Sequence, residues 1–391
     1  MRVLIAFDKF KDSLTAPAAC ETAATALAAL KPAWTIQQCP LTDGGEGFAA
    51  ILTQASHGQM HRCTVTGPRG QPVEPSIGLV QLKNIPSAAR EILSLPPDIP
   101  TDASIALIEM ATASGLALLA SDERDPWQTT TLGTGELIQF ARSQGAAAIL
   151  LGVGGSATND LGLGALNAMG LQLHDAQNQS VTPPVPQTWP RIVKLASTID
   201  PATPPIRIAC DVANPLLGPN GAAAIYGPQK GLRAEDLPKL EAESARLATL
   251  LCAHLGKSPG TMTTPGAGAA GGIAFGLMTA ADAQLLSGNE LVSAWLDLDT
   301  HLAQADLVIT GEGSFDTSSL NGKGPGALAT RAVGLGKTVH VFAGRIDLPD
   351  IGEAGLNLHP ITPATMPLAE ALPAASRLLS ESISATFSPD A

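Results

Sequence analysis

The sequence has few aromatic and charged residues, and each shortage excludes a class of protein. Of its 391 residues, one is Tyr, four are Trp and eight are Phe, or 3% of the chain. With 45% hydrophobic residues, the cores must therefore be built from Ala, Leu, Val and Ile. Charged residues make up 15%, against roughly a quarter in an average domain, which excludes a largely disordered chain.

The sequence contains no run of lysine or arginine. Its formal net charge is −12, so it lacks the basic patch with which proteins bind nucleic acid, and we expect no nucleic-acid partner. An acidic protein can still bind an anion through local cations, backbone N–H groups or a metal ion.

Paired cysteines and long apolar runs are also missing. The five cysteines are widely spaced and odd in number, which predicts buried thiols in a reducing cytoplasm and neither disulfides nor a zinc site. The first apolar run has five residues, too few for a signal peptide. No stretch offers the roughly 20 apolar residues of a membrane span, so we expect no membrane contact.

One pattern recurs along the chain: an apolar strand, a polar glycine-containing turn, and a helix. It begins with "RVLIAF" at residues 2–7, followed by a helix that Ser13 or Thr15 can cap. Similar units start near residues 35, 147 and 306, and "TVHVFAG" adds a further strand at 338–344. Alternating strands and helices predict an α/β fold with parallel strands, and the length predicts two domains.

Polar residues gather directly after these strands, where open α/β sheets bind ligands. We expect the clusters to lie on one sheet edge. Any one of these clusters alone is more typical of a helix cap or a turn. Caps and turns do not require several similar clusters at one edge, so the clusters together favour a binding site. The clusters are Asp8, Lys9, Lys11 and Ser13; residues 43–47 ("DGGEG"); residues 154–160 ("GGSATND"); Asp211 and Asn214; Lys230; and Glu312, Asp316 and Lys323.

Carboxylates, lysines, glycines and hydroxyls, with few aromatics or histidines, suit phosphoryl transfer. That reaction depends mainly on positioning and on neutralising the charge of the transferred group. Glycine turns and helix N-termini present N–H groups to phosphate, carboxylates bind Mg²⁺, and a further carboxylate can accept the proton of the attacking hydroxyl.

Other motifs do not fit their usual context. "GAGAAGG" at 266–272 matches GxGxxG but follows no strand, so a ligand-binding loop and tight packing are equally good interpretations. "GLGKT" at 334–338 lacks the first glycine of a phosphate-binding loop and is better explained as the end of a helix. No GxSxG elbow or metal-binding histidine spacing occurs.

Several longer motifs together resemble the bacterial type I glycerate kinase family. "IAFDKFKDSLTA" is similar to that family's N-terminal motif, and "DGGEG", "GGSATND", "CDVANPLLG", "GPQKG", "GAGAAGG" and "ADLVITGEG" follow in the family's order. The similarity extends from about residue 3 to residue 345, which is nearly the whole chain.

The resemblance implies a kinase that uses ATP and Mg²⁺ to phosphorylate D-glycerate at the 2-hydroxyl. It also implies two α/β domains with the active site in the cleft between them. One is a discontinuous Rossmann- or flavodoxin-like parallel sheet, which we place at 1–62 and 290–391. The other is a smaller mixed α/β domain, which we place at 63–289.

We assign candidate roles accordingly, as hypotheses. The catalytic candidates are Asp8, Lys9, Lys11, Asp43, Asp211, Glu312 and Lys323. Those for the nucleotide phosphates are Gly154, Gly155, Ser156, Thr158, Gly266, Gly268 and Gly271. The candidates for metal binding are Asp43, Asp160 and Asp211.

Three departures from the family motifs leave alternatives open. Lys9 stands where the family has serine, Leu161 replaces a glycine, and Ser318 replaces a glutamine in "DxQS". The lost glutamine leaves the acceptor open, so the substrate could be another small hydroxy acid. Two further alternatives are that the 3-hydroxyl is phosphorylated and that the protein is a non-catalytic sugar-acid sensor, although a sensor would predict that the carboxylates at the turns are lost, and they are present. Monomer and homodimer are equally open.

Overall fold

The computed structural model describes residues 1–42, 44–320, 324–348 and 355–388. The chain divides into two compact units, a first unit of Met1–Asp43 with Val292–Ala391 and a second unit of Gly44–Leu291. Residues 44–62, which we had expected in the discontinuous domain, belong to the second unit. The mixed α/β unit is also the larger of the two and not the smaller.

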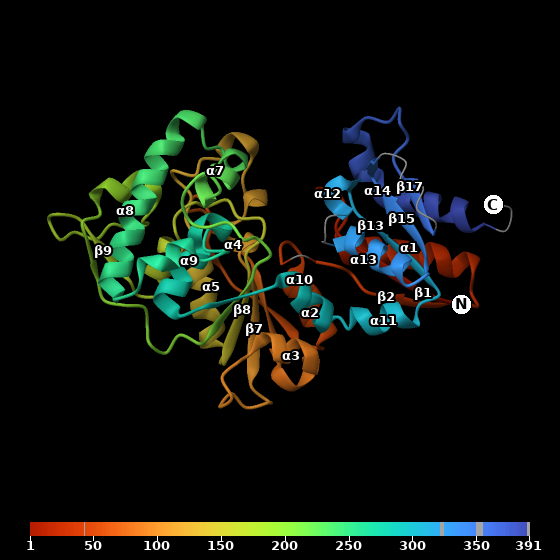
Figure 1. The fold of residues 1–391 in the computed structure, drawn as a ribbon, viewed down its shortest axis with the longest axis horizontal. Coiled ribbons are helices and arrows are strands. Elements are labelled where there is room, and N and C mark those ends of the chain that lie inside the picture. The colour runs from red at the N-terminus through yellow and green to blue at the C-terminus, as the bar shows by residue number, and fades with distance from the viewer. Residues whose placement is uncertain (43, 321–323, 349–354, 389–391) are drawn as a thin grey trace. The chain divides into compact units, whose positions relative to one another are not determined.

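The first unit is built on a five-stranded sheet whose strands are all parallel (Figure 1). In spatial order the strands are β2 (Thr35–Gln38), β1 (Arg2–Phe7), β13 (Leu307–Gly311), β15 (Thr338–Ala343) and β17 (Leu356–Pro360). Counted along this unit the order is 2-1-3-4-5, that of flavodoxin-like folds, and it confirms the predicted class.

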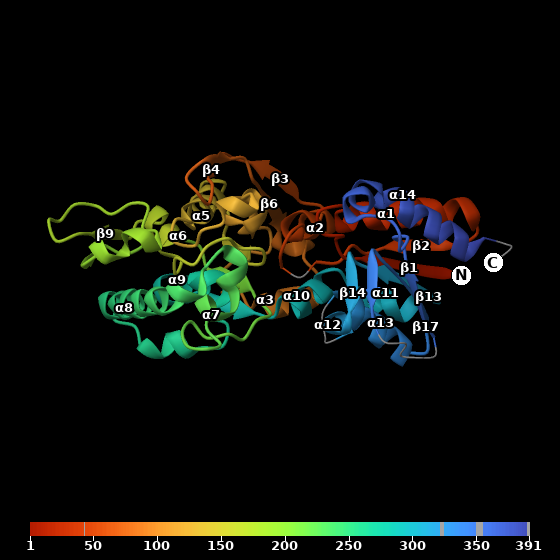
Figure 2. The same ribbon diagram turned by 90° about the horizontal axis from the view of Figure 1, so that it is seen from above.

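Helices cover both faces of this sheet, as Figure 2 shows. One face carries α1 (Ala16–Leu30) and α14 (Leu368–Phe387), and the other carries α11 (Leu298–Gln304) and α13 (Gly324–Gly334). Because both faces are covered, β1 is apolar and buried from Val3 to Phe7. The predicted cap of the first helix is Thr15, whose Oγ1 accepts a hydrogen bond from the Ala18 N–H at 3.3 Å.

The second unit contains a six-stranded mixed sheet in simple sequential order. The strands are β3 (Gln59–Arg62), β6 (Ser76–Gln81), β7 (Ser104–Glu109), β8 (Ala148–Gly152), β11 (Ile206–Ala209) and β12 (Gln284–Leu286). The last four are parallel, and β3 and β6 are antiparallel additions at one edge.

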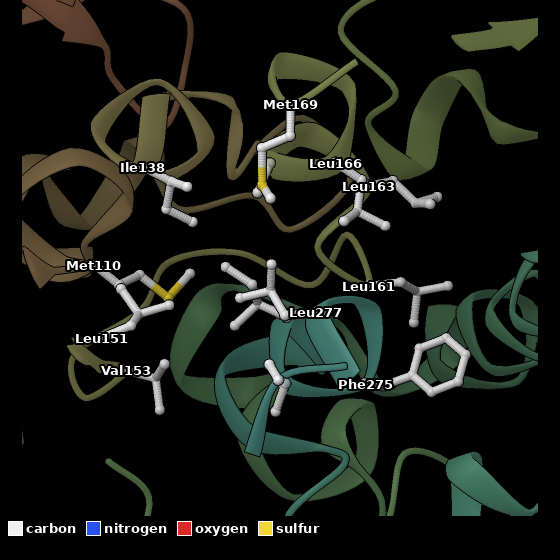
Figure 3. Close-up of a cluster of buried hydrophobic side chains, with 14 of the residues drawn as sticks. Met110, Ile138, Leu151, Val153, Leu161, Leu163, Leu166, Met169, Phe275 and Leu277 are labelled. Carbon is white, nitrogen blue, oxygen red and sulfur yellow. The ribbon is translucent and has the colours of Figure 1, made fainter. Parts of the chain in front are cut away.

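Sequential parallel strands joined by right-handed crossovers place their helices on a single face of the sheet. That face carries α5 (Leu132–Ser143), α6 (Leu163–Ala168) and α9 (Ala269–Ala281). Figure 3 shows Ile138, Leu166 and Leu277 of these helices pointing into one apolar cluster with Leu151 of β8. The opposite face carries α2 (Phe48–Ala55), where Gly78 of β6 lets the Thr53 side chain approach.

The remaining elements are short or peripheral. In the first unit they are β14 (Ser314–Asp316), β16 (Arg345–Asp347) and α12 (Thr317–Leu320). In the second unit they are α3 (Ser87–Leu93), α4 (Ala111–Ser114), α7 (Ala222–Tyr226), α8 (Leu237–Leu255), β4 (Val65–Thr66), β5 (Pro72–Val73), β9 (Gln172–His174) and β10 (Lys194–Ala196). Helix α10 (Gly288–Trp295) spans the boundary between the units. None of the helices that the structure describes is long and apolar enough to cross a bilayer.

The prediction that the polar clusters share one sheet edge is wrong. Strands β1 and β13 belong to the first sheet, and β8 and β11 to the second. The clusters after β1 and β13 therefore lie on a different sheet from those after β8 and β11. The prediction failed because the strand–turn–helix units have the same sequence pattern in both sheets, so the pattern does not show which sheet a unit joins.

Two histidines form a half-buried stack on the first sheet. His340 Nδ1 lies 2.9 Å from His359 Nε2, and the two rings are stacked with an interplanar angle of 7°. Phe342 packs against both rings, and Phe387 packs against that of His340. Burial, with the nearby His359, lowers the pKa of His340 to about 4, and burial also lowers the pKa of His359.

We expect the first unit to lose stability as the pH falls from about 6.5 to 4. The unfolded chain binds protons at an ordinary histidine pKa of about 6.5, whereas folded His340 resists protonation until about 4. Thermal unfolding across this range should show a smaller pH-dependence in H340F/H359F than in the wild type. The exposed His57, as H57N, is the control and should leave the slope unchanged. Equal slopes in wild type and double variant would contradict the assignment.

Candidate functional site

The first candidate cluster lies at the carboxyl edge of the first unit's sheet. Strand order reverses between β1 and β13, and at such a switch point the loops part and leave a crevice. Phe7 pairs with Gly311 at the ends of the two strands, and the Asp8 N–H donates to the Gly311 carbonyl at 3.0 Å. Asp8 and Glu312 thus leave adjacent strands at the same level.

The backbone brings the predicted lysines to the same place. Asp8 Oδ1 accepts a hydrogen bond from the Lys9 N–H at 2.6 Å, and the Lys11 N–H lies 3.2 Å from where a Cβ on Gly313 would be. Asp8 Oδ2 lies near the N-terminus of α13, 3.6 Å from the Cβ position of Gly324. The structure therefore brings together Asp8, Lys9, Lys11 and Glu312.

Two predicted catalytic residues, Asp43 and Lys323, lie outside the described residues. Arg345, which the sequence analysis did not name, lies at this edge. Its N–H donates to the Gly313 carbonyl at 3.1 Å, and its exposed guanidinium pairs with Asp347 at 3.1 Å. The signal was present, since "GRID" follows a strand just as the other clusters do.

The second cluster lies at the carboxyl edge of the second unit's sheet, where residues 44–47 pack against the loop after β8. The Gly154 N–H donates to the Gly44 carbonyl at 3.2 Å, and a Cβ on Gly154 would lie 2.7 Å from the Gly45 Cα. A side chain at residue 154 would therefore push these loops apart.

Glu109, at the end of β7, anchors the same loop and was missed by the sequence analysis. Its carboxylate is buried and accepts hydrogen bonds from the Gly47 N–H at 2.8 Å and the Ala49 N–H at 3.0 Å. These N–H groups lie at the N-terminus of α2. Glu109, which belongs to strand β7, therefore caps the helix with its carboxylate. The acid directly after the apolar "SIALI" was the available signal.

Asp160 is fully buried, and its surroundings indicate a role in holding the fold together. Its carboxylate accepts hydrogen bonds from the Thr131 N–H at 2.7 Å and hydroxyl at 2.8 Å, and from the N–H groups of Gly162 and Gly164 at 3.1 and 3.3 Å. Burial raises the pKa of Asp160, and these hydrogen bonds oppose the shift. With four donors on its two oxygens, Asp160 anchors the start of α6, and the geometry gives no support to the predicted metal-binding role.

We call residues 154–159 the anion loop, because its backbone presents several N–H groups. Those of Gly155, Ser156 and Thr158 have no hydrogen-bond acceptor within the described part of the chain. Thr158 Oγ1 and Asn159 Oδ1 are buried and also lack a partner there. Buried polar atoms are normally satisfied, so the N–H groups and the Thr158 hydroxyl, which are donors, fit an anionic ligand such as a nucleotide phosphate. The Asn159 oxygen is an acceptor and would need a donor group of the ligand.

The glycines of residues 266–272 have a packing explanation. A Cβ on Gly268 would lie 2.2 Å from the Pro215 carbonyl oxygen, and one on Gly271 would lie 2.0 Å from the Thr158 carbonyl oxygen. The Gly268 N–H also donates to the Asn214 carbonyl at 2.9 Å. Gly266, Gly268 and Gly271 thus bring this segment against the anion loop and the loop after β11. Whether they also contact a ligand stays a prediction.

Asp211 follows β11 at the same edge. Its Oδ1 accepts hydrogen bonds from the Ser287 hydroxyl at 3.3 Å and from the Asn289 N–H at 3.2 Å, in the first turn of α10. No three His, Cys, Asp or Glu side chains among the described residues are grouped to hold a metal ion. Mg²⁺ in kinases is held by one or two carboxylates together with substrate phosphates, so Asp211 is compatible with that role.

Ala270 adopts a left-handed conformation that costs alanine roughly 1–2 kcal/mol, with φ 53° and ψ 40°. A270G removes this strain, but glycine loses more conformational entropy on folding than alanine does. We therefore expect the free energy of unfolding to stay unchanged or to rise by up to about 1 kcal/mol. A280G, in the right-handed part of α9, is the matched control and should cost about 1 kcal/mol. Urea unfolding measures both. Equal losses in the two variants would contradict the strain at Ala270.

The chain is similar to known proteins along nearly its whole length. Residues 3–388 match the model of the glycerate kinase family. The chain is 37% identical to "Glycerate kinase" of Bacillus subtilis (strain 168), over 95% of this chain and 93% of the relative. It is also 37% identical to "Glycerate 2-kinase" of Escherichia coli (strain K12), over 90% and 87%.

A solved structure is similar over almost the whole length. The crystal structure of a protein described as glycerate kinase 2 from Salmonella typhimurium LT2 superposes with a TM-score of 0.75 at 34% identity. The similarity covers 99% of this chain and 97% of the other. The resemblance inferred from the motifs is therefore confirmed.

Proposed function

Because this chain belongs to the glycerate kinase family, we propose that it transfers the γ-phosphate of ATP to the 2-hydroxyl of D-glycerate. The products are 2-phosphoglycerate and ADP. The observation that carries the proposal is the family match over residues 3–388. The choice of the 2-hydroxyl is supported by the name of the Escherichia coli relative. We place the reaction in the cytoplasm.

We propose that the second unit binds the nucleotide. The unpaired N–H groups of Gly155, Ser156 and Thr158 would donate to phosphate oxygens, and the Thr158 hydroxyl would add a further donor. Backbone donors held by their surroundings need little reorganisation when charge develops on the transferred group. The anion loop meets this condition, since the Ala157 N–H donates to the Ser114 carbonyl at 2.9 Å and Asp160 anchors the loop's end.

Mg²⁺ would bind at Asp211, with Asp43 as the second candidate ligand. When bound, the ion neutralises phosphate charge and orients the phosphates. Asp211 is suited to this because the Ser287 hydroxyl and the Asn289 N–H orient its carboxylate.

We propose that the edge of the first unit binds D-glycerate. Lys9 and Lys11 would hold the glycerate carboxylate or the γ-phosphate, and Glu312 and Lys323 would complete the site. In the reaction the 2-hydroxyl oxygen forms a bond to the γ-phosphorus and the bond from that phosphorus to the bridging oxygen of ADP breaks. The hydroxyl proton passes to a carboxylate, for which Asp8, Asp43 and Asp211 are the candidates.

The product of a reaction with ATP, Mg²⁺ and D-glycerate tests the proposal, with ³¹P and ¹³C NMR to locate the phosphate. 2-Phosphoglycerate is expected. 3-Phosphoglycerate would keep the kinase and overturn the choice of hydroxyl. No turnover in folded protein, with D-glycerate or with a panel of other small hydroxy acids, would favour a non-catalytic sensor.

We expect D211N to reduce turnover by at least about 100-fold, if Asp211 serves as metal ligand or base. Asparagine keeps the oxygen that accepts from Ser287 and Asn289, so the fold should persist. The matched control is D200N, because Asp200 is a surface carboxylate of the same unit that pairs with Arg142 at 2.5 Å. Its rate should stay within about twofold of the wild type. A D211N rate close to the wild-type rate would remove Asp211 from the site.

A further inference from the structure

Lys230 is a buried cation placed directly behind the anion loop. It is 1% exposed, and its Nζ donates to the Thr158 carbonyl at 2.7 Å. The turn that carries Lys230 is closely packed, because a Cβ on the following residue, Gly231, would lie 2.1 Å from the Arg124 carbonyl oxygen. The side chain therefore enters the interior from a fixed backbone.

A buried ammonium with so few partners is expensive for a fold. The group has three N–H donors, and among the described residues the Thr158 carbonyl is its one hydrogen-bond acceptor. Methionine would fill a similar volume without the desolvation penalty. A packing role alone therefore does not explain a lysine at this position.

The atoms around Lys230 also point to a ligand. Thr158, whose carbonyl Lys230 binds, carries a buried side-chain oxygen that lacks a partner in the described chain, and so does the neighbouring Asn159. Asp160 is the charged group whose field reaches Lys230, and its own oxygens are occupied by Thr131, Gly162 and Gly164. No hydrogen bond joins Lys230 to Asp160 in the described chain, and an anion bound on the loop would add a second negative charge near the ammonium.

We propose that Lys230 is the positioning residue of the nucleotide site. Its ammonium holds the Thr158 carbonyl so that the unpaired N–H groups of Gly155, Ser156 and Thr158 face the phosphates, and its charge favours the bound polyphosphate through the loop. This inference rests on the proposed ATP-binding role of the second unit. It does not depend on which acceptor is phosphorylated.

Calorimetric titration of full-length protein with ATP and Mg²⁺, in the absence of glycerate, tests the proposal. We expect K230M to weaken ATP binding at least tenfold, and in kinetic assays to change the KM for D-glycerate by less than about twofold. K194M replaces an exposed lysine of the same unit and should bind ATP like the wild type. Folded K230M with wild-type ATP affinity would overturn the proposal, even if its thermal stability had changed.

The pH-dependence of binding provides a second measurement that needs no variant. Burial lowers the pKa of Lys230 to about 7, and Asp160 opposes this shift. Loss of the charge above that pH should weaken binding of the Mg²⁺–ATP complex at least about fivefold between pH 7 and pH 9. Folded K230M should show little of this dependence. If K230M does not fold, a wild-type affinity that stays constant from pH 7 to pH 9 would overturn the proposal.

Failure of the proposed function gives a different result. If ATP binds with the expected dependence on Lys230 but D-glycerate is not phosphorylated, the positioning role stands and the acceptor is wrong. If the wild type binds no ATP at all, both proposals fail together.

Discussion

The arrangement of the second unit depends on one buried carboxylate. Asp160 collects hydrogen bonds from Thr131 at the start of α5 and from Gly162 and Gly164 at the start of α6. The chain that leaves β8 is thereby tied to two helices at one point, and the anion loop lies between that point and the strand. Breaking a hydrogen-bonded network around a buried charge leaves the charge uncompensated, so this point tolerates little change.

Around that anchor the loops pack backbone against backbone. Gly154 faces residues 44 and 45, Gly268 faces Pro215, and Gly271 faces the Thr158 carbonyl. Glycine is needed where no side chain fits, and the result is an edge whose polar surface consists largely of peptide groups. Two buried charged side chains support this edge: Glu109 caps α2, and Lys230 donates a hydrogen bond to the Thr158 carbonyl. An acidic protein can in this way provide an anion site without a basic surface.

Sequence reasoning predicted the local units well and their assembly less well. The strand over residues 2–7, its capped helix and the polar turns after β8, β11 and β13 were recognisable, because apolar periodicity and capping are local properties. The prediction that all the polar turns lie on one sheet edge was wrong, because sheet membership depends on contacts between segments that are distant in sequence. Arg345 and Glu109 were missed, although each follows an apolar strand in the same way.

By itself, then, the sequence determined the α/β class, several of the strand–turn–helix units and, through its motifs, the family. Tertiary structure alone decided what surrounds the individual residues. By its sequence, Asp160 in the "TND" turn would suit a metal ligand equally well. In the structure its Oδ2 accepts two hydrogen bonds from Thr131, which lies 29 residues earlier in the chain. Lys230 and Thr158 are 72 residues apart, and their hydrogen bond exists only because the turn after α7 folds back against the anion loop. Such roles are set by burial and by partners remote in sequence, which no local pattern encodes.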